Sequence, residues 1–171
     1  MLTLMLALIT PAEANWPNLH TLDQSVSPAT DVEEDDDFGS SLTSGDYNND
    51  GYMDLAIGSP GETIGSAFWT GSVTVHYGGS NGLDGSTSVW SQNSIDGSTN
   101  EDLDGFGAAL ATGNFDGDQY DDIFIGWGDD VSGFANAGRV AVKYGTYSGV
   151  TSTAPSDSWS QGSFPGNGSQ E

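Results

Sequence analysis

The sequence predicts an all-β protein built from about two successive blades of a β-propeller, each with four short antiparallel strands. The first observation is a repeat. The residue pattern from Phe38 to Gly58 recurs without a gap from Phe106 to Gly126, 68 residues later. The second is that short apolar or alternating stretches are bounded by Gly, Asp and Asn, as strands are bounded by turns. The third is that no segment keeps the 3.6-residue period of an amphipathic helix.

Each blade supplies four strand signals in the same order. In chain order these are the segments around Leu42 and Leu110, Leu55–Ile57 and Ile123–Ile125, Ser72–Gly78 and Arg139–Gly145, and the segments that contain Trp90 and Trp159. The second pair is continuously apolar, which is typical of inner strands. The third pair alternates with period two, which predicts half-buried strands, and the fourth pair is expected to be more exposed.

The composition favours cations as partners. The 171 residues are enough for one domain with a core, and they carry 25 Asp and Glu against two basic residues, Arg139 and Lys143. Two cations neutralise few phosphates, so nucleic acid and anionic membrane surfaces are poor partners. With two His and no Cys, the chain has little material for a nucleophilic triad, and we expect that it is not an enzyme. His76 and Lys143 occupy equivalent repeat positions, which favours a solvated face over a catalytic role.

Residues 1–14 have the pattern of a signal peptide. An apolar run from Met1 to Ile9 is followed by Ala12-Glu13-Ala14, a small-x-small cleavage site. We therefore expect an extracellular or cell-surface protein. The apolar run is too short to span a bilayer, so the mature chain is expected not to insert into a membrane. A buried strand or a misassigned start is the alternative interpretation.

The repeat divides the remaining chain into three segments. Residues 15–36 are acidic and contain a partial repeat strand, because Leu22-Asp23-Gln24 aligns with Trp90-Ser91-Gln92. Residues 37–104 form the first repeat. Residues 105–171 form the second repeat and the start of a next one.

Two loops place oxygen-bearing groups at alternate positions, immediately before an apolar strand. The predicted ligands are the side chains of Asp46, Asn48, Asp50 and Asp54 with the carbonyl of Tyr52, and the side chains of Asn114, Asp116, Asp118 and Asp122 with the carbonyl of Tyr120. Calcium takes about six to eight hard oxygen ligands, so the sequence predicts two Ca2+ sites. Magnesium fits less well because it requires stricter octahedral geometry. The alternative is a pair of ordinary Asp/Asn/Gly turns without an ion.

The second loop departs from the first at one position. Gly51 can adopt positive φ at low cost, whereas its counterpart is Gln119, in which that conformation costs about 1–2 kcal/mol. The second loop is therefore expected to turn differently or to bind its ion more weakly.

Short motifs bracket the two loops: Phe38-Gly39 with Gly58-Ser59-Pro60, and Phe106-Gly107 with Gly126-Trp127-Gly128. Together with the loops and strands between them, these motifs resemble the FG-GAP repeats of integrin α-subunit β-propellers and their microbial relatives. The second copy lacks the Pro. The resemblance implies structural calcium in the loops between blade strands, and a role in adhesion or ligand binding without catalysis. Propellers of this family contain more blades than the two expected here, so an incomplete propeller is predicted.

The ligand is expected to be a protein or a glycan. The loops Ser59–Thr70 and Trp127–Ala137 differ between the repeats, and variable loops on a repeated scaffold are the preferred place for recognition. Two other functions stay open at this point. The chain could be the non-catalytic propeller part of a larger secreted enzyme, such as a polysaccharide lyase or a phospholipase, or it could be a structural repeat of the cell surface.

Overall fold

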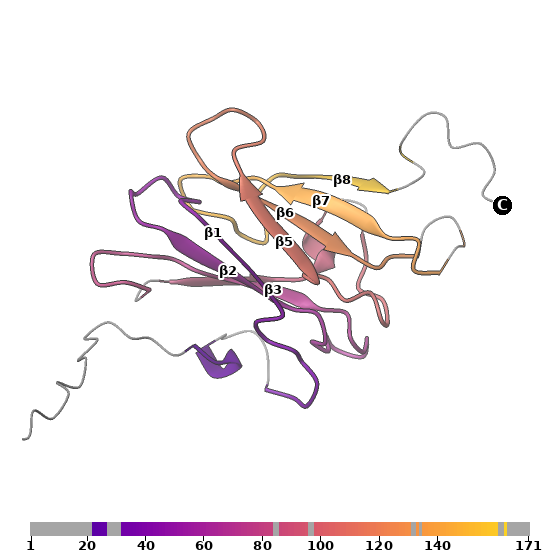
Figure 1. The fold of residues 1–171 in the computed structure, drawn as a ribbon. Helices are drawn as coiled ribbons and strands as arrows, with labels where there is room; N and C mark the ends of the chain where they lie inside the picture. Colours follow the sequence, from indigo (N-terminus) through magenta and orange to yellow (C-terminus); the bar gives the residue numbers. More distant parts are fainter. Residues whose placement is uncertain are drawn as a thin grey trace, which may run out of the picture.

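The described part of the chain forms eight strands in two four-stranded antiparallel sheets (Figure 1). It comprises residues 22–26, 32–83, 86–95, 98–130, 133, 135–160 and 163 of a computed structural model. The first sheet contains β1 (Ser41–Gly45), β2 (Asp54–Ser59), β3 (Ser72–His76) and β4 (Thr87–Trp90). The second contains β5 (Ala109–Gly113), β6 (Asp122–Trp127), β7 (Arg139–Lys143) and β8 (Ser156–Ser160). The predicted all-β class with blade-like repeats is confirmed.

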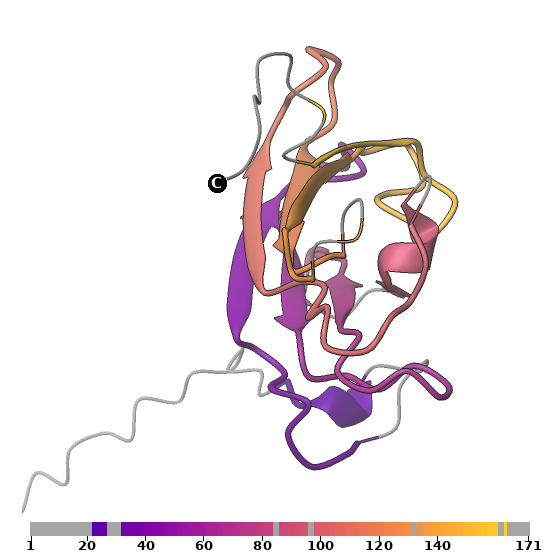
Figure 2. The ribbon, with the colours of Figure 1, turned by 90° about the vertical axis from the view of Figure 1, so that its right-hand side faces the viewer.

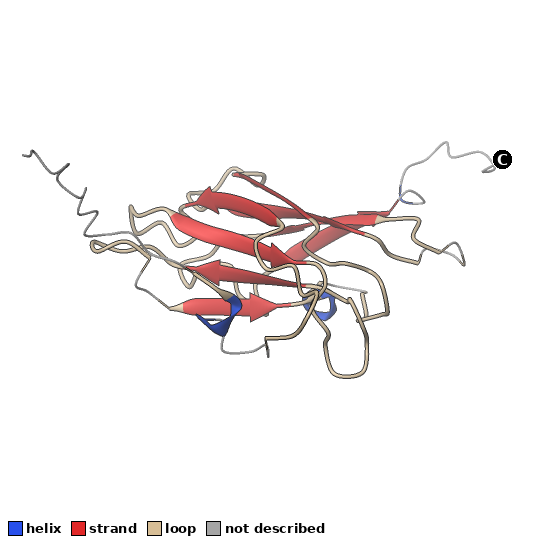
Figure 3. Ribbon diagram, turned by 60° about the horizontal axis from the view of Figure 1, so that its bottom comes forward, coloured by secondary structure: helices blue, strands red, loops and turns tan. Residues whose placement is uncertain are grey.

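The two sheets have the same pairing register. Each strand pairs with the next one along the chain, and the order is β1-β2-β3-β4 and β5-β6-β7-β8. Leu42 lies opposite Ile57 in the first sheet, as Leu110 lies opposite Ile125 in the second. The described connections between neighbouring strands lie at the ends of the sheets (Figure 3). The 68-residue offset of the sequence is therefore also an equivalence in space.

The equivalence extends to residues with a left-handed backbone. Asp35 and Leu103 have φ of 68° and 69°, and Trp69 and Asn136 have φ of 54° and 52°. Positive φ is unfavourable for Leu and Trp and more readily adopted by Asp and Asn, yet it recurs here at matching positions whichever type is present. The turn geometry is therefore imposed by the blade and not by local sequence preference.

The sheets pack through their first strands and one inserted segment. Strands β1 and β5 lie side by side (Figures 1 and 2). Behind them, Phe106 is fully buried and lies edge-on between Trp90 and Trp127, with ring centroids 5.7 and 5.0 Å away. Such aromatic pairs add to the burial of apolar area, so this cluster is the centre of the core.

The segment that carries Phe106 sits directly on the backbone of the first sheet. We call Phe106–Gly107 the plug. Its Phe106 N–H donates to the carbonyl of Thr70 (2.7 Å), and its Gly107 carbonyl accepts from the Ser41 hydroxyl (2.6 Å). A Cβ atom added at Gly58 would overlap the Gly107 carbonyl oxygen. Glycine is thus required in the middle of β2 because another backbone approaches it closely.

Burial in the outer part of each blade exceeds the expectation. All five residues of β3 are buried, so this strand is not half-buried as its alternation predicted. His76 and Lys143 are also buried, which corrects the prediction that they occupy a solvated face. Lys143 Nζ donates to the carbonyls of Ser94 (2.8 Å), Ser152 (3.1 Å) and Ala154 (2.8 Å). Three carbonyls match the three donors of an ammonium group, while burial lowers the pKa of Lys143 to about 8.

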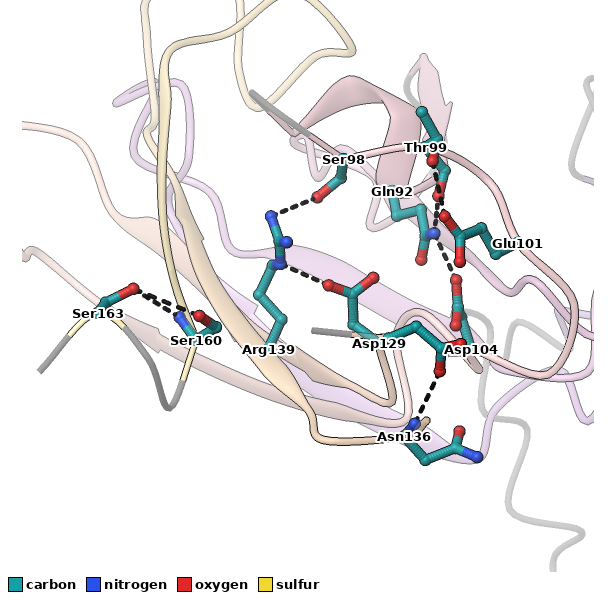
Figure 4. A network of polar contacts seen from close by, with 11 residues as sticks. Gln92, Ser98, Thr99, Glu101, Asp104, Asp129, Asn136, Arg139, Ser160 and Ser163 are labelled. Carbon is teal, nitrogen blue, oxygen red and sulfur yellow. Dashed lines mark hydrogen bonds and ion pairs between the residues drawn. The ribbon is translucent and has the colours of Figure 1, made fainter. Parts of the chain in front are cut away.

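The other basic residue is also used inside the protein. Arg139 Nε forms an ion pair with Asp129 Oδ2 at 2.6 Å, and its guanidinium donates to the Ser98 hydroxyl at 3.2 Å (Figure 4). Since Arg139 and Lys143 are the only Lys or Arg side chains of the sequence, the surface field comes almost entirely from carboxylates.

The N-terminal segment begins with a turn that also belongs to the repeat. The described residues Gln24–Val26 form a 3-10 helix, as do the equivalent residues Gln92–Ser94. The predicted signal peptide, and most of the partial strand before Gln24, lie outside the described residues. Within the described ranges, no helix is long and apolar enough to cross a bilayer.

Replacement of Phe106 by Ala tests the central role of the plug. The change removes a fully buried ring between two Trp side chains, and we expect a loss of about 3–5 kcal/mol in the free energy of unfolding, measured by urea denaturation. Phe38→Ala is the matched control, because Phe38 occupies the same repeat position but is only partly buried. Equal losses in the two variants would contradict this account of the core.

The buried Lys143 predicts a pH dependence of stability. Its pKa is lowered on folding, so between about pH 8 and pH 10 the unfolded chain binds a proton that the folded chain has released. Stability should therefore rise with pH in this window, by up to about 1.4 kcal/mol per pH unit. Denaturation of wild type and Lys143→Met across the window measures the effect. The slope should be missing in the variant.

Candidate metal centre

The first predicted loop joins β1 to β2 and binds its own backbone through its oxygen-bearing side chains. Asp46 accepts hydrogen bonds from the N–H groups of Asp50 (3.0 Å) and Gly51 (2.9 Å). Asn48 Oδ1 accepts from Asp50 N–H (3.0 Å), and Asp50 Oδ1 accepts from Tyr52 N–H (2.9 Å). Three predicted ligands, Asp46, Asn48 and Asp50, therefore share one tight turn.

The second loop joins β5 to β6 and repeats this arrangement. Asn114 Oδ1 accepts from Gly117 N–H (2.7 Å). Asp116 Oδ1 accepts from Asp118 N–H (3.0 Å), and Asp118 Oδ1 accepts from Tyr120 N–H (2.7 Å). The structure thus places Asn114, Asp116 and Asp118 on a turn equivalent to that of the first loop.

The last carboxylate of each loop, Asp54 or Asp122, is buried and ties the loop to the strands behind it. Asp54 and Asp122 are 1% and 0% exposed, and both oxygens of each accept a backbone N–H. The donors are Tyr47 (2.9 Å) and Gly78 (2.8 Å) for Asp54, and Phe115 (2.6 Å) and Gly145 (2.9 Å) for Asp122. Burial raises the pKa of both groups most strongly, the backbone donors lower it, and the neighbouring loop carboxylates raise it again.

The donor set fits a hard cation such as calcium. Each loop offers three carboxylates, one amide oxygen and one backbone carbonyl, all of them oxygen ligands. A carboxylate has about four acceptor sites, so a single hydrogen bond to each oxygen leaves capacity for an ion. Within the residues that the structure describes, no three acidic or His side chains converge as the ligands of one ion. Calcium at the ten predicted residues therefore remains a prediction.

The two loops turn differently, and the difference has a side-chain cause. Gly51 has φ of 89°, whereas Gln119 does not have a positive φ. In the first loop Asp46 accepts from Gly51 N–H. In the second, the equivalent residue is an amide, and Asn114 Nδ2 instead donates to the carbonyl of Asp118. The exchange of a carboxylate for an amide thus accompanies the loss of the glycine turn.

One residue of the site could not be found by aligning the repeats. Asp121 Oδ2 accepts from Asp46 N–H (2.9 Å), and Asp121 N–H donates to the Asp46 carbonyl (3.1 Å). Beside this contact, Tyr47 is fully buried and its hydroxyl lies 2.7 Å from Thr112 Oγ1. Asp121 aligns with Met53 in the first repeat, and this mismatch is the only sequence signal for the contact. The two loops are consequently joined by direct hydrogen bonds.

A second candidate region lies at the Ser59–Thr70 loop. A cavity of about 350 Å3 is lined by Trp69 and Pro60 from this loop, by Asp35 and Asp37, and by Leu103 on the segment before the plug. Trp69 is 49% exposed. An exposed aromatic ring beside carboxylates can pack against a ligand and accept its hydrogen bonds.

Two comparisons with known proteins agree with this geometry. Residues 38–76 match the family model of the FG-GAP repeat. Over 123 residues, the chain is 34% identical to the phosphatidylinositol-glycan-specific phospholipase D of Mus musculus; the match covers 67% of this chain and 14% of the mouse protein. The chain therefore spans about one seventh of the length of that relative.

The role of the buried loop carboxylate is testable without calcium. Asp54→Asn replaces one acceptor by an amide N–H2 facing a backbone N–H, so we expect a loss of about 1–3 kcal/mol in the free energy of unfolding, measured by urea denaturation in EDTA. Asp50→Asn is the control, because Asp50 lies exposed in the same loop. The interpretation is wrong if the control loses as much stability as Asp54→Asn.

Proposed function

Because this chain is an FG-GAP repeat protein, we propose that it is a secreted or cell-surface, calcium-binding propeller module that mediates adhesion or the binding of a protein or glycan. Calcium is structural in this proposal, and the module carries out no catalytic step. The observation that carries it is the pair of equivalent oxygen-rich turns, each closed by a buried carboxylate.

The charges of the molecule support a structural cation. Asp46, Asp50 and Asp54 are grouped in one loop; burial raises the pKa of Asp54 most, and the nearby loop carboxylates raise it further. A bound Ca2+ would supply positive charge that Arg139 and Lys143 do not provide there, because both are engaged elsewhere. An ion that binds only the folded state stabilises it by mass action.

The binding face in this proposal is the Ser59–Thr70 loop with its cavity. Phe68 and Trp69 are 63% and 49% exposed, and Asp35 and Asp37 line the same hollow as Trp69. Aromatic rings and carboxylates suit a carbohydrate or a protein surface, whereas the acidic field repels nucleic acid.

A calcium titration tests the proposal. Isothermal calorimetry should detect two sites, and Asp50→Ala and Asp118→Ala should each abolish one of them. The melting temperature should rise with calcium in the wild type. Extracellular calcium modules bind as weakly as about 10⁻⁴–10⁻³ M, so the titration must extend to several millimolar.

Glu34→Ala is the control for this titration, because Glu34 is exposed and lies outside both loops. It should retain both sites and the full increase in melting temperature. Absence of binding heat up to several millimolar calcium would contradict the proposal and favour ordinary acidic turns.

The similarity to a phospholipase favours a second candidate function. In this alternative, the chain is the non-catalytic propeller part of a larger secreted enzyme. The support is the 34% identity over 123 residues to a protein of which the match covers 14%. The complete reading frame distinguishes the two: a neighbouring domain with a catalytic constellation favours the enzyme, and further FG-GAP repeats favour the adhesion module.

A further inference from the structure

The two sheets carry equivalent faces, but the described residues cover only one of them. On the first sheet, the plug Phe106–Gly107 lies against Gly58, Gly71 and Trp90. On the second sheet, within the part of the chain that the structure describes, the matching face carries no such segment. It forms a cavity of about 370 Å3, which we call the slot, with Gly126, Gly138, Val140 and Trp159 among its lining residues.

Strand register establishes that the slot and the covered face correspond. Val73 pairs with Gly58 on one side and with Trp90 on the other. In the second sheet, Val140 pairs with Gly126 and with Trp159 in the same way. The second glycine corresponds as well, since Gly71 and Gly138 precede equivalent strands with φ of 87° and 86°.

Within the described chain, neither the backbone conformation nor a close contact requires a glycine at position 126. It does not have a positive φ, and a Cβ atom added there would lie 3.6 Å from Ala109 Cβ, an ordinary van der Waals distance. A glycine in the middle of a strand weakens the strand, and it often marks a place where another backbone approaches. At the equivalent Gly58 that backbone is the plug. The slot therefore has the form of a receptor for a second plug.

An uncovered plug exists at the other end of the molecule. Asp37 and Gly39 have φ of 57° and 93°, close to the 62° and 88° of Gly105 and Gly107. A Cβ atom added at Gly39 would meet nothing within 4 Å, whereas one at Gly107 would lie 2.7 Å from the Ser72 carbonyl oxygen. Phe38–Gly39 thus already has the backbone of an inserted plug, and no described residue of the chain receives it as the first sheet receives Phe106–Gly107.

The apolar groups around the two free ends match each other. On the blade that carries the uncovered plug, Leu42 and Met53 are 59% and 58% exposed. On the blade that carries the slot, Phe115 is 52% exposed, although its equivalent Tyr47 is fully buried between the repeats. Inside the chain, the neighbour of the Tyr47 loop is the polar Asp121; at the free end, the equivalent residue is Met53, which suits the phenyl ring of Phe115.

We propose that copies of this chain associate head to tail, with Phe38–Gly39 of one copy inserted into the slot of the next. The inserted plug would repeat between copies the contacts that Phe106–Gly107 makes within one copy. Such an interface joins two different surfaces, so each copy can both donate and accept. A net charge of −23 opposes the approach of identical chains, and screening by salt should therefore strengthen association.

Sedimentation velocity of the full chain tests the proposal in a buffer with calcium and 0.5 M salt. Wild type should form species of at least twice the 17.7 kDa chain mass, and their share should grow with protein concentration and with salt. Gly126→Ala blocks the slot and Phe38→Ala removes the plug, so each variant alone should be monomeric. An equimolar mixture of the two should form a dimer and nothing larger, because one variant retains the plug and the other retains the slot.

Stability measurements keep this test independent of folding defects. Gly126→Ala should melt at the wild-type temperature or above, since the added methyl group has room, whereas Gly58→Ala should melt at a clearly lower temperature. Three outcomes would each overturn the proposal. They are a monomeric wild type at every concentration, undiminished association of Gly126→Ala, and a mixture of the two variants that remains monomeric.

Discussion

The insertion of the plug into the first sheet is the contact on which the rest of the structure depends. It buries Phe106 between Trp90 and Trp127 and thereby sets how close the two sheets approach. With the sheets at this separation, β1 lies along β5, and the two acidic loops meet at the ends of these strands. The hydrogen bonds between Asp46 and Asp121 follow from that placement. The geometry of the two acidic loops therefore depends on the packing of the core.

The excess of acidic side chains is the second constraint, and the charged groups find their partners within short distances in the fold. Lys143 donates hydrogen bonds to three backbone carbonyls, and Arg139 forms an ion pair with Asp129. The loop carboxylates are satisfied by backbone N–H groups instead of by basic side chains. This holds the oxygens in register on short turns, but it leaves their negative charges uncompensated. A cation is the natural complement of such a turn, because it adds charge without replacing the backbone that shapes the loop.

Structure that is determined within a single blade could be predicted by comparing the two copies of the repeat in the sequence. The strand order, the alignment of Leu42 with Leu110 and the altered turn at Gln119 all follow from one copy compared with the other. Contacts between one blade and the next could not be predicted in this way. The plug, which comes from the other copy, packs against Val73 of β3, and alternation along a strand cannot report a cover contributed by distant residues. Asp121 was missed for the same reason, since its partner lies in the other copy.

The differences between the copies are most informative at the free ends. Tyr47 and Asp121 meet inside the chain, and this junction is closed by hydrogen bonds. Their equivalents, Phe115 and Met53, lie apart at opposite ends, and both are apolar and exposed. A surface that faced only water would favour polar replacements at these positions. An exposed apolar side chain on each of the two blades, together with a glycine-lined slot, supports the proposed contact with another blade.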